Sequence, residues 1–130
     1  MTKEKQIVDI AKQVINDEVE ALIGLKDYID ESFVEIVNII CDCKGRLIFT
    51  GIGKSGHISK KISATLSSTG TSSFFIHSTE AFHGDLGMIQ GEDIVVAISY
   101  SGETEDLLKT IPVIKTLGCS VIGVSGNDES

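Results

Sequence analysis

The sequence has no tryptophan, a single proline and an aromatic content of only 5%, whereas 42% of its 130 residues are hydrophobic. Its core must therefore be built from Ile, Val, Leu and Ala, a composition that suits a parallel sheet covered by helices. A chain of this length can enclose one hydrophobic core, so we expect one compact α/β domain.

Cysteine is also scarce, with only Cys41, Cys43 and Cys119. An odd number without a C-x-x-C pair excludes a disulfide framework and the usual zinc-ligand spacing, so buried reduced thiols are the simplest interpretation. A metal pair at Cys41 and Cys43 is the alternative, and we otherwise expect no metal.

Long hydrophobic runs are absent too. Near the amino terminus, Asp9 and Lys12 interrupt the apolar positions, which leaves no signal-peptide core and no membrane span. We therefore expect a cytoplasmic protein with no membrane partner.

Acidic residues are missing from one part of an otherwise acidic chain. The net charge of −8 argues against nucleic-acid binding, so we expect no nucleic-acid partner. Between Asp42 and Glu80 there is no acid at all, and this window holds Lys44, Arg46, Lys54, Lys60 and Lys61. It predicts one positive region for a small anion, the alternative being a chance cluster of solvated lysines.

The first 43 residues have helical periodicity. Apolar residues recur at i, i+3, i+4 and i+7 from Lys3 to about Leu25, and a second helical stretch follows residues 27–32 and runs to about Cys43. We assign 1–43 to an N-terminal helical segment that packs on the domain or on a neighbouring subunit. A homo-oligomer, dimer or tetramer, is the expected state.

Residues 44–130 alternate between strands and helices. Strands are predicted at 47–51, 73–77, 94–99 and 120–124, which indicates a three-layer α/β sandwich with a parallel sheet. Each of the two intervening helices has an apolar face. The first contains Ile58, Ile62 and Leu66, and the second contains Leu107, Leu108, Ile111, Ile114 and Leu117. Pro112 should kink the second helix. A polar turn follows the last strand, so we expect the chain to stop inside its domain with the last strand or strands missing.

Two loops at strand ends carry the binding chemistry. Gly51-Ile52-Gly53-Lys54-Ser55-Gly56 stands between a strand and a helix, where glycines let the backbone approach an anion and Lys54 and Ser55 add donors. A Walker A loop is disfavoured because Ile48 occupies its first glycine position, and a Rossmann dinucleotide site lacks its acid at the end of the next strand. A tight turn without a ligand is the remaining alternative.

The second loop, Ser99-Tyr100-Ser101-Gly102-Glu103-Thr104, favours a single phosphate. The hydroxyls of Ser99, Ser101 and Thr104 can converge with backbone N–H groups at the carboxyl end of a strand, where open α/β sheets bind ligands. Ser101 could instead act only as an N-cap for the following helix. Capping explains one hydroxyl but not three.

Between these loops lie residues 78–87, which include His83 beside Gly84 and Asp85. A histidine there could exchange a proton with a ligand near neutral pH, although a structural or solvated histidine is equally expected from position alone. His57 and His77 are weaker candidates.

The three motifs Gly-Ile-Gly-Lys-Ser-Gly-His, Ala-Phe-His-Gly-Asp-Leu-Gly-Met and Ser-Tyr-Ser-Gly-Glu-Thr resemble, in this order, the sugar isomerase (SIS) domain and specifically the D-arabinose-5-phosphate isomerases. The resemblance implies a flavodoxin-like SIS fold over 44–130. It also implies interconversion of ribulose 5-phosphate and arabinose 5-phosphate for octulosonate (Kdo) and surface-polysaccharide synthesis, without a cofactor.

By the same resemblance, phosphate would be held by Gly53, Ser55, Ser99, Ser101 and Thr104, and the catalytic positions would be Lys54, His83 and Asp106. Asp106 replaces the family's usual glutamate, with Glu105 beside it. The reaction removes a proton and forms an enediolate. His83 suits the role of acid/base, and Lys54 suits that of the cation that offsets the enediolate charge. Relatives use a second histidine and often CBS domains beyond this stretch, so the chain is expected to bind sugar phosphate with an incomplete catalytic site.

The same domain type also serves as the ligand-reading half of transcription regulators. A non-catalytic sugar-phosphate sensor is therefore the alternative function. The leading helices are acidic and have no helix-turn-helix, which favours the enzyme.

Overall fold

The computed structural model describes all 130 residues, and the chain divides into two compact units, Met1–Val37 and Asn38–Ser130. The first unit contains α1 (Lys3–Gly24), a 3₁₀ turn η1 (Leu25–Tyr28) and most of α2 (Glu31–Cys41). The two helices predicted from the apolar periodicity are thus confirmed. None of the helices is both long and apolar enough to cross a membrane.

The second unit is built on a four-stranded sheet. Its strands are β1 (Leu47–Gly51), β2 (Ser73–His77), β3 (Ile94–Ile98) and β4 (Ser120–Val124). All neighbours pair in parallel, in the order β2-β1-β3-β4. The predicted strands are confirmed, except that the third ends one residue early because Ser99 already belongs to the loop.

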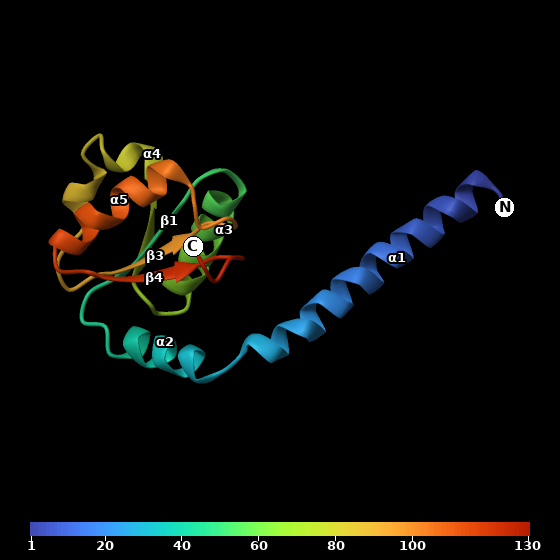
Figure 1. Cartoon of the computed structure of the whole chain (residues 1–130), viewed down its shortest axis with the longest axis horizontal. Helices are drawn as coiled ribbons and strands as arrows, with labels where there is room; N and C mark the ends of the chain where they lie inside the picture. Colours follow the sequence, from blue (N-terminus) through green and yellow to red (C-terminus); the bar gives the residue numbers. More distant parts are fainter. The chain divides into compact units, whose positions relative to one another are not determined.

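Helices cover both faces of this sheet, as Figure 1 shows. α3 (Gly53–Ser68) packs on β1 and β2, while the short α4 (Ser78–Ala81) packs beside α5 (Glu105–Thr116). A 3₁₀ turn, η2 (Asp85–Met88), leads towards β3. The strand order reverses between β1 and β3, so these two central strands form the switch point at which open α/β sheets bind ligands.

The buried face of α3 differs from the predicted one. Its buried residues are Gly56, Ser59 and Ser63, whereas Ile58 and Ile62 are exposed. The Ser59 hydroxyl donates to the Ser55 carbonyl at 2.7 Å, and the Ser63 hydroxyl is 2.9 Å from that of Ser73. Because these serine hydroxyls are hydrogen-bonded, the small side chains let the helix lie close to the strands. Of the predicted apolar residues, only Leu66 is half-buried, so the sheet does not bury Ile58 and Ile62.

The buried face of α5 also departs from the apolar pattern. Leu107, Thr110 and Ile114 are buried, while Leu108 and Leu117 are about 40% exposed. The Thr110 hydroxyl donates to the Asp106 carbonyl at 2.7 Å, which removes the cost of burying it. The helix continues on both sides of Pro112, and the kink expected at this residue stays a prediction.

The amino ends of β1 and β3 are joined by an ion pair. Asp93 is 2% exposed, and its carboxylate accepts hydrogen bonds from the Arg46 backbone N–H at 2.8 Å, from the Arg46 guanidinium at 3.0 and 3.3 Å and from the Gln90 N–H at 2.8 Å. The guanidinium also lies 4.7 Å from the ring centre of Phe74. Burial raises the pKa of the Asp93 carboxyl, but the hydrogen bonds from Arg46 and Gln90 outweigh burial and hold this pKa below its ordinary value.

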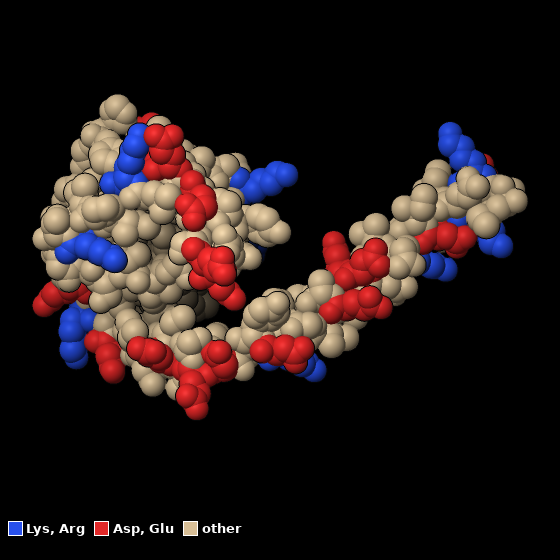
Figure 2. All heavy atoms as spheres, viewed as in Figure 1, with Lys and Arg blue, Asp and Glu red and all other residues tan.

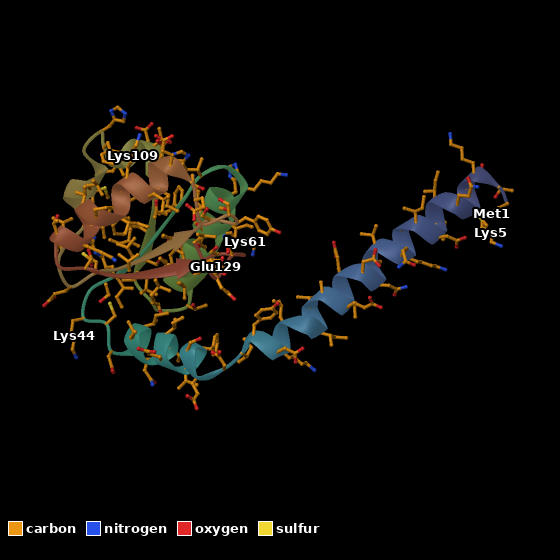
Figure 3. The ribbon with its side chains drawn as sticks, viewed as in Figure 1. Met1, Lys5, Lys44, Lys61, Lys109 and Glu129 are labelled. Atoms are coloured by element: carbon orange, nitrogen blue, oxygen red, sulfur yellow. The ribbon has the colours of Figure 1, made fainter.

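This pair corrects the prediction of one continuous positive region. Arg46 is neutralised by Asp93, and Arg46 and Lys44 both precede β1, at the opposite edge of the sheet from its carboxyl end. Lys54, Lys60 and Lys61 lie on α3 instead. Figure 3 shows Lys44 in the loop before β1 and Lys61 on α3. Lys44 and Arg46 are therefore separated from Lys54 by the length of β1, although they are near it in the sequence.

Replacing the buried carboxylate tests the ion pair. For Asp93→Asn we expect a loss of roughly 2–4 kcal/mol in the free energy of unfolding at pH 7, because the buried amide cannot neutralise Arg46. Folding lowers the Asp93 pKa, so its ionised form stabilises the fold above the ordinary value of 3.8, and this contribution is lost as the pH falls through the folded-state pKa.

Urea titrations of both proteins between pH 7 and pH 2 measure this effect. The difference between wild type and Asp93→Asn should shrink on acidification. Asp128→Asn, in the exposed C-terminal turn, is the matched control and should unfold like wild type. A difference that stays constant with pH would contradict the role given to the charge.

Candidate functional site

The loop after β1 depends on two glycines that lie against each other. A Cβ on Gly56 would lie 3.0 Å from the Gly51 carbonyl oxygen, and a Cβ on Gly51 would lie 3.0 Å from the Ile98 carbonyl oxygen and 3.1 Å from the Gly56 nitrogen. Larger residues would push the first turn of α3 away from the ends of β1 and β3. Gly53 has a φ of +59°, which also favours glycine.

The amino end of α3 has no side-chain cap. Ile52 occupies the N-cap position, and no side chain accepts a hydrogen bond from the first-turn amides. These amides and the positive end of the helix dipole are therefore free to bind an anion. Lys54, in this first turn, is exposed and forms no ion pair, so its charge is also available.

The loop after β3 is organised around one buried hydroxyl. Ser99 is 5% exposed, its Oγ lies 2.8 Å from the Thr104 Oγ1, and it accepts a hydrogen bond from the Gly102 N–H at 3.1 Å. The N-cap of α5 is Thr104, not Ser101 as the capping alternative supposed. Ser101 accepts from the Glu103 N–H at 3.1 Å within the loop, because α5 begins only at Glu105.

These two loops meet at one cavity of about 390 Å³. Lys54 and Ser55 line it from α3, and Ser99 lines it from the end of β3. They are neighbours because β1 and β3 are paired in the sheet and both end at this edge. Of the predicted site residues, these three are the ones that line the cavity, while Thr104 is connected to it through the hydroxyl of Ser99.

The same cavity has a third wall that the sequence did not predict. Ser125 and Gly126, just after β4, line it together with the exposed ring of Tyr100. The Gly126 N–H donates to the Tyr100 carbonyl at 2.9 Å, and a Cβ on Gly126 would lie 3.1 Å from the Tyr100 ring. The sequence did contain a signal for this wall. Ser125-Gly126 follows the last strand in the same way as Ser101-Gly102 follows β3.

The segment after β2 starts inside the domain and ends at its surface. The hydroxyls of Thr50 and Ser78 lie 2.9 Å apart, and both residues are buried, which joins the end of β1 to the start of α4. His83 is exposed, donates its backbone N–H to the Glu80 carbonyl at 2.9 Å and precedes Gly84, whose φ is +117°. His83 is not among the residues that line the Lys54 and Ser99 cavity.

The acidic candidates stand in the first turn of α5. Asp106 is exposed and also does not line the cavity. Its neighbour Glu105 is paired with Lys109 at 2.7 Å, and the hydrogen bond from Lys109 lowers the pKa of the Glu105 carboxyl and raises that of the lysine. Figure 3 shows Lys109 on α5. Asp106 forms no salt bridge of its own, although its charge also helps to raise the pKa of Lys109.

Metal-binding clusters are absent: no three His, Cys, Asp or Glu side chains lie close enough to hold a metal ion. All three cysteines are free thiols, but only Cys119 is buried, and the expectation of burial is wrong for the exposed Cys41. Burial raises the pKa of the Cys119 thiol, whose Sγ donates to the Gln90 carbonyl. The cavity therefore offers hydroxyl, amide and ammonium donors, a set suited to a small anionic ligand.

Comparison with known proteins agrees with this geometry. Residues 39–130 match the family model described as the SIS domain. The chain is 45% identical over 130 residues to arabinose 5-phosphate isomerase KpsF of Escherichia coli O6:H1 and 44% identical over 130 residues to arabinose 5-phosphate isomerase KdsD of Pseudomonas aeruginosa. These matches cover 99% and 100% of the chain, and the chain spans 40% of the length of each relative.

A solved structure shares the fold over the whole chain. An Escherichia coli protein in complex with arabinose 5-phosphate superposes with a TM-score of 0.93 at 38% identity, which covers 100% of this chain and 69% of that one. The sheet order, the two strand-end loops and these matches lead to one conclusion: the chain belongs to the SIS domain family.

Proposed function

We propose that this chain is the sugar-phosphate-binding part of an aldose-ketose isomerase that interconverts D-ribulose 5-phosphate and D-arabinose 5-phosphate, for octulosonate and surface-polysaccharide synthesis. The observation that carries the proposal is the cavity at which Lys54, Ser55 and Ser99 meet at the uncapped amino end of α3. The names of the relatives at 44% and 45% identity support this substrate class.

The phosphate is proposed to bind at the first turn of α3. The amides of Gly53, Lys54 and Ser55 face a ligand there without competition from a side-chain cap. Ser99 and Thr104 already share a hydrogen bond of 2.8 Å, so their hydroxyls can reorient together towards phosphate oxygens. Ser101, in the same loop, is the third proposed hydroxyl.

The isomerisation moves a proton from C2 of the open-chain aldose to C1 and passes through an enediolate. We assign His83 as the acid/base that carries this proton and Lys54 as the cation that offsets the negative charge on the enediolate oxygens. Asp106, exposed at the start of α5, is the proposed acidic partner.

Self-association and a cytoplasmic location belong to the same proposal. α1 exposes apolar side chains along its length, including Ile10 at 64% and Leu22 at 66%, which supports a homo-oligomer. Three free cysteines suit a reducing compartment.

Removing the buried hydroxyl of the second loop tests the phosphate site. For Ser99→Ala we expect the affinity for arabinose 5-phosphate to fall about tenfold to a hundredfold, because a hydrogen bond to a charged group is lost. Isothermal titration calorimetry with this chain measures the affinity, with unphosphorylated arabinose as the ligand that should not bind.

Ser120→Ala is the matched control, because Ser120 is exposed on β4 and makes no side-chain hydrogen bond. It should bind like wild type. If Ser99→Ala also bound like wild type, the phosphate would have to lie elsewhere.

Replacing His83 tests the isomerase chemistry. For His83→Ala we expect kcat to fall roughly a hundredfold or more with KM little changed, because the proton carrier is lost while the phosphate donors remain. The interconversion is followed with this chain and with any longer form of the protein. His57→Ala, at an exposed histidine of α3, is the control and should keep full turnover.

Undiminished turnover in His83→Ala would remove this residue from the mechanism. The sensor would be favoured over the enzyme if wild type bound arabinose 5-phosphate but neither this chain nor a longer form of the protein converted it.

A further inference from the structure

The most exposed large hydrophobic residue of the second unit stands at the cavity described above. Tyr100 is 87% exposed, and it follows Ser99 directly after the end of β3. Because single exposed hydrophobic residues are common on protein surfaces, the position of this ring matters more than its exposure. Tyr100 lines the same cavity as Lys54, Ser55 and Ser99, so a ligand bound to these donors lies within reach of the ring.

The ring of Tyr100 lies against the backbone that follows β4. The Gly126 N–H donates to the Tyr100 carbonyl at 2.9 Å, which joins the loop after β3 to the loop after β4. A Cβ on Gly126 would lie 3.1 Å from Cε2 of the ring and 3.3 Å from Cδ2, closer than ordinary van der Waals contact. Gly126 is not among the glycines with a positive φ, so the backbone conformation does not require glycine there. The close approach of the ring does require it.

The cavity has a polar wall and an apolar wall. Lys54, Ser55 and Ser99 supply the donors, and Lys54 is the only charged residue among those that line the cavity. Figure 2 shows a similar balance on the visible face of the second unit, where the charged side chains stand apart on a largely uncharged surface. The apolar wall is made of aliphatic and aromatic side chains: Ile58, Ile98, Tyr100 and Val124.

Such a cavity fits an anionic group that is attached to a longer body. Its volume of about 390 Å³ lies within the range of about 300–1,000 Å³ that small-molecule sites occupy. In such sites apolar walls bury the body of the ligand, and a few polar groups orient it. Inorganic phosphate would use the donors and leave the ring uncovered, whereas a phosphate ester with a carbon chain can use both walls.

We propose that Tyr100 is a specificity-determining residue whose ring contacts the C–H groups of the sugar chain, while Ser99 and the first turn of α3 hold the phosphate. This inference rests on the phosphate site proposed above and adds the residue that distinguishes a sugar phosphate from inorganic phosphate. An aromatic ring supplies a large contact area at a low entropic cost, because few side-chain torsions have to be fixed. Gly126 is a positioning residue, since it acts through the ring.

Affinities for two ligands, measured on the whole chain, test the ring. For Tyr100→Ala we expect the affinity for arabinose 5-phosphate to fall roughly threefold to tenfold and the affinity for inorganic phosphate to keep its wild-type value, because only the sugar touches the ring. Tyr100→Phe keeps the ring and should bind both ligands like wild type. Isothermal titration calorimetry measures the first affinity, and displacement of arabinose 5-phosphate by inorganic phosphate measures the second.

Gly126→Ala tests the position of the ring. The added Cβ would displace the ring, so this variant should lose affinity for arabinose 5-phosphate as Tyr100→Ala does and should bind inorganic phosphate like wild type. The double variant should show no further loss, because no ring is left to displace. The matched control is Gly123→Ala, at an exposed glycine of β4 where a Cβ would meet nothing within 4 Å, and it should bind both ligands like wild type.

Tyrosine fluorescence reports the contact directly. The chain has no tryptophan and two tyrosines, so Tyr28→Phe leaves Tyr100 as the only tyrosine. Arabinose 5-phosphate should change this emission with a midpoint equal to its calorimetric affinity, and saturating inorganic phosphate should leave the emission unchanged. Tyr100→Phe, which keeps Tyr28 in the first unit, is the control and should respond to neither ligand. Emission of Tyr100 that does not respond to arabinose 5-phosphate would contradict the contact.

The outcomes separate this inference from the proposed function. If wild type and Tyr100→Ala bind arabinose 5-phosphate equally well, this inference alone is wrong. An equal loss for both ligands in Tyr100→Ala would mean that the ring supports only the phosphate loop, and an equal loss in Tyr100→Phe would mean that the hydroxyl makes the contact. Either result overturns the proposal. Wild type that does not bind arabinose 5-phosphate contradicts the proposed function, and this inference falls with it.

Discussion

The in-register pairing of β1 with β3 is the constraint on which the rest of the second unit depends. Leu47 pairs with Ile94 and Thr50 with Ala97. The Arg46–Asp93 ion pair stands one residue before this ladder and joins the two strands at their amino ends. A slip of two residues would keep the side chains on their faces but would shift one strand by about 7 Å. The loops after β1 and β3 would then no longer meet at the cavity, so the ion pair at the amino ends of these strands supports the cavity at their carboxyl ends.

Close packing of α3 is the second requirement of the site. Gly51 and Gly56 are in contact, and Ser59 and Ser63 continue this close approach along the helix. A helix with large residues on this face would stand farther from the sheet, and its amino end would move away from Ser99. The outcome leaves Ile58 exposed at the cavity, where it forms part of the apolar wall. Small residues on α3 therefore determine the geometry of the cavity as well as the packing of the layer.

The residues proposed for phosphate binding and those proposed for proton transfer stand on different kinds of structure in this chain. The proposed phosphate donors stand at the ends of two central, buried strands, which hold them in place. His83 stands on a surface turn next to Gly84, and Asp106 stands on the outer surface of α5. The proposed phosphate donors Ser99 and Thr104 are thus buried or half-buried, while the groups assigned to proton transfer occupy exposed positions.

The sequence by itself determined the element types, the parallel sheet and the positions of the two loops after β1 and β3, because period-2 and period-3.6 patterns and glycine-rich turns are local properties of the chain. It did not predict that α3 buries serines rather than Ile58 and Ile62, since that depends on how near the sheet lies. The sequence also grouped Arg46 with Lys54, although a whole strand separates them. The tertiary structure alone decided which residues share the cavity. Lys54, Ser55 and Ser99 meet with Ser125 and Gly126 because parallel strands distant in the sequence end at one edge of the sheet, a relation that no local pattern contains.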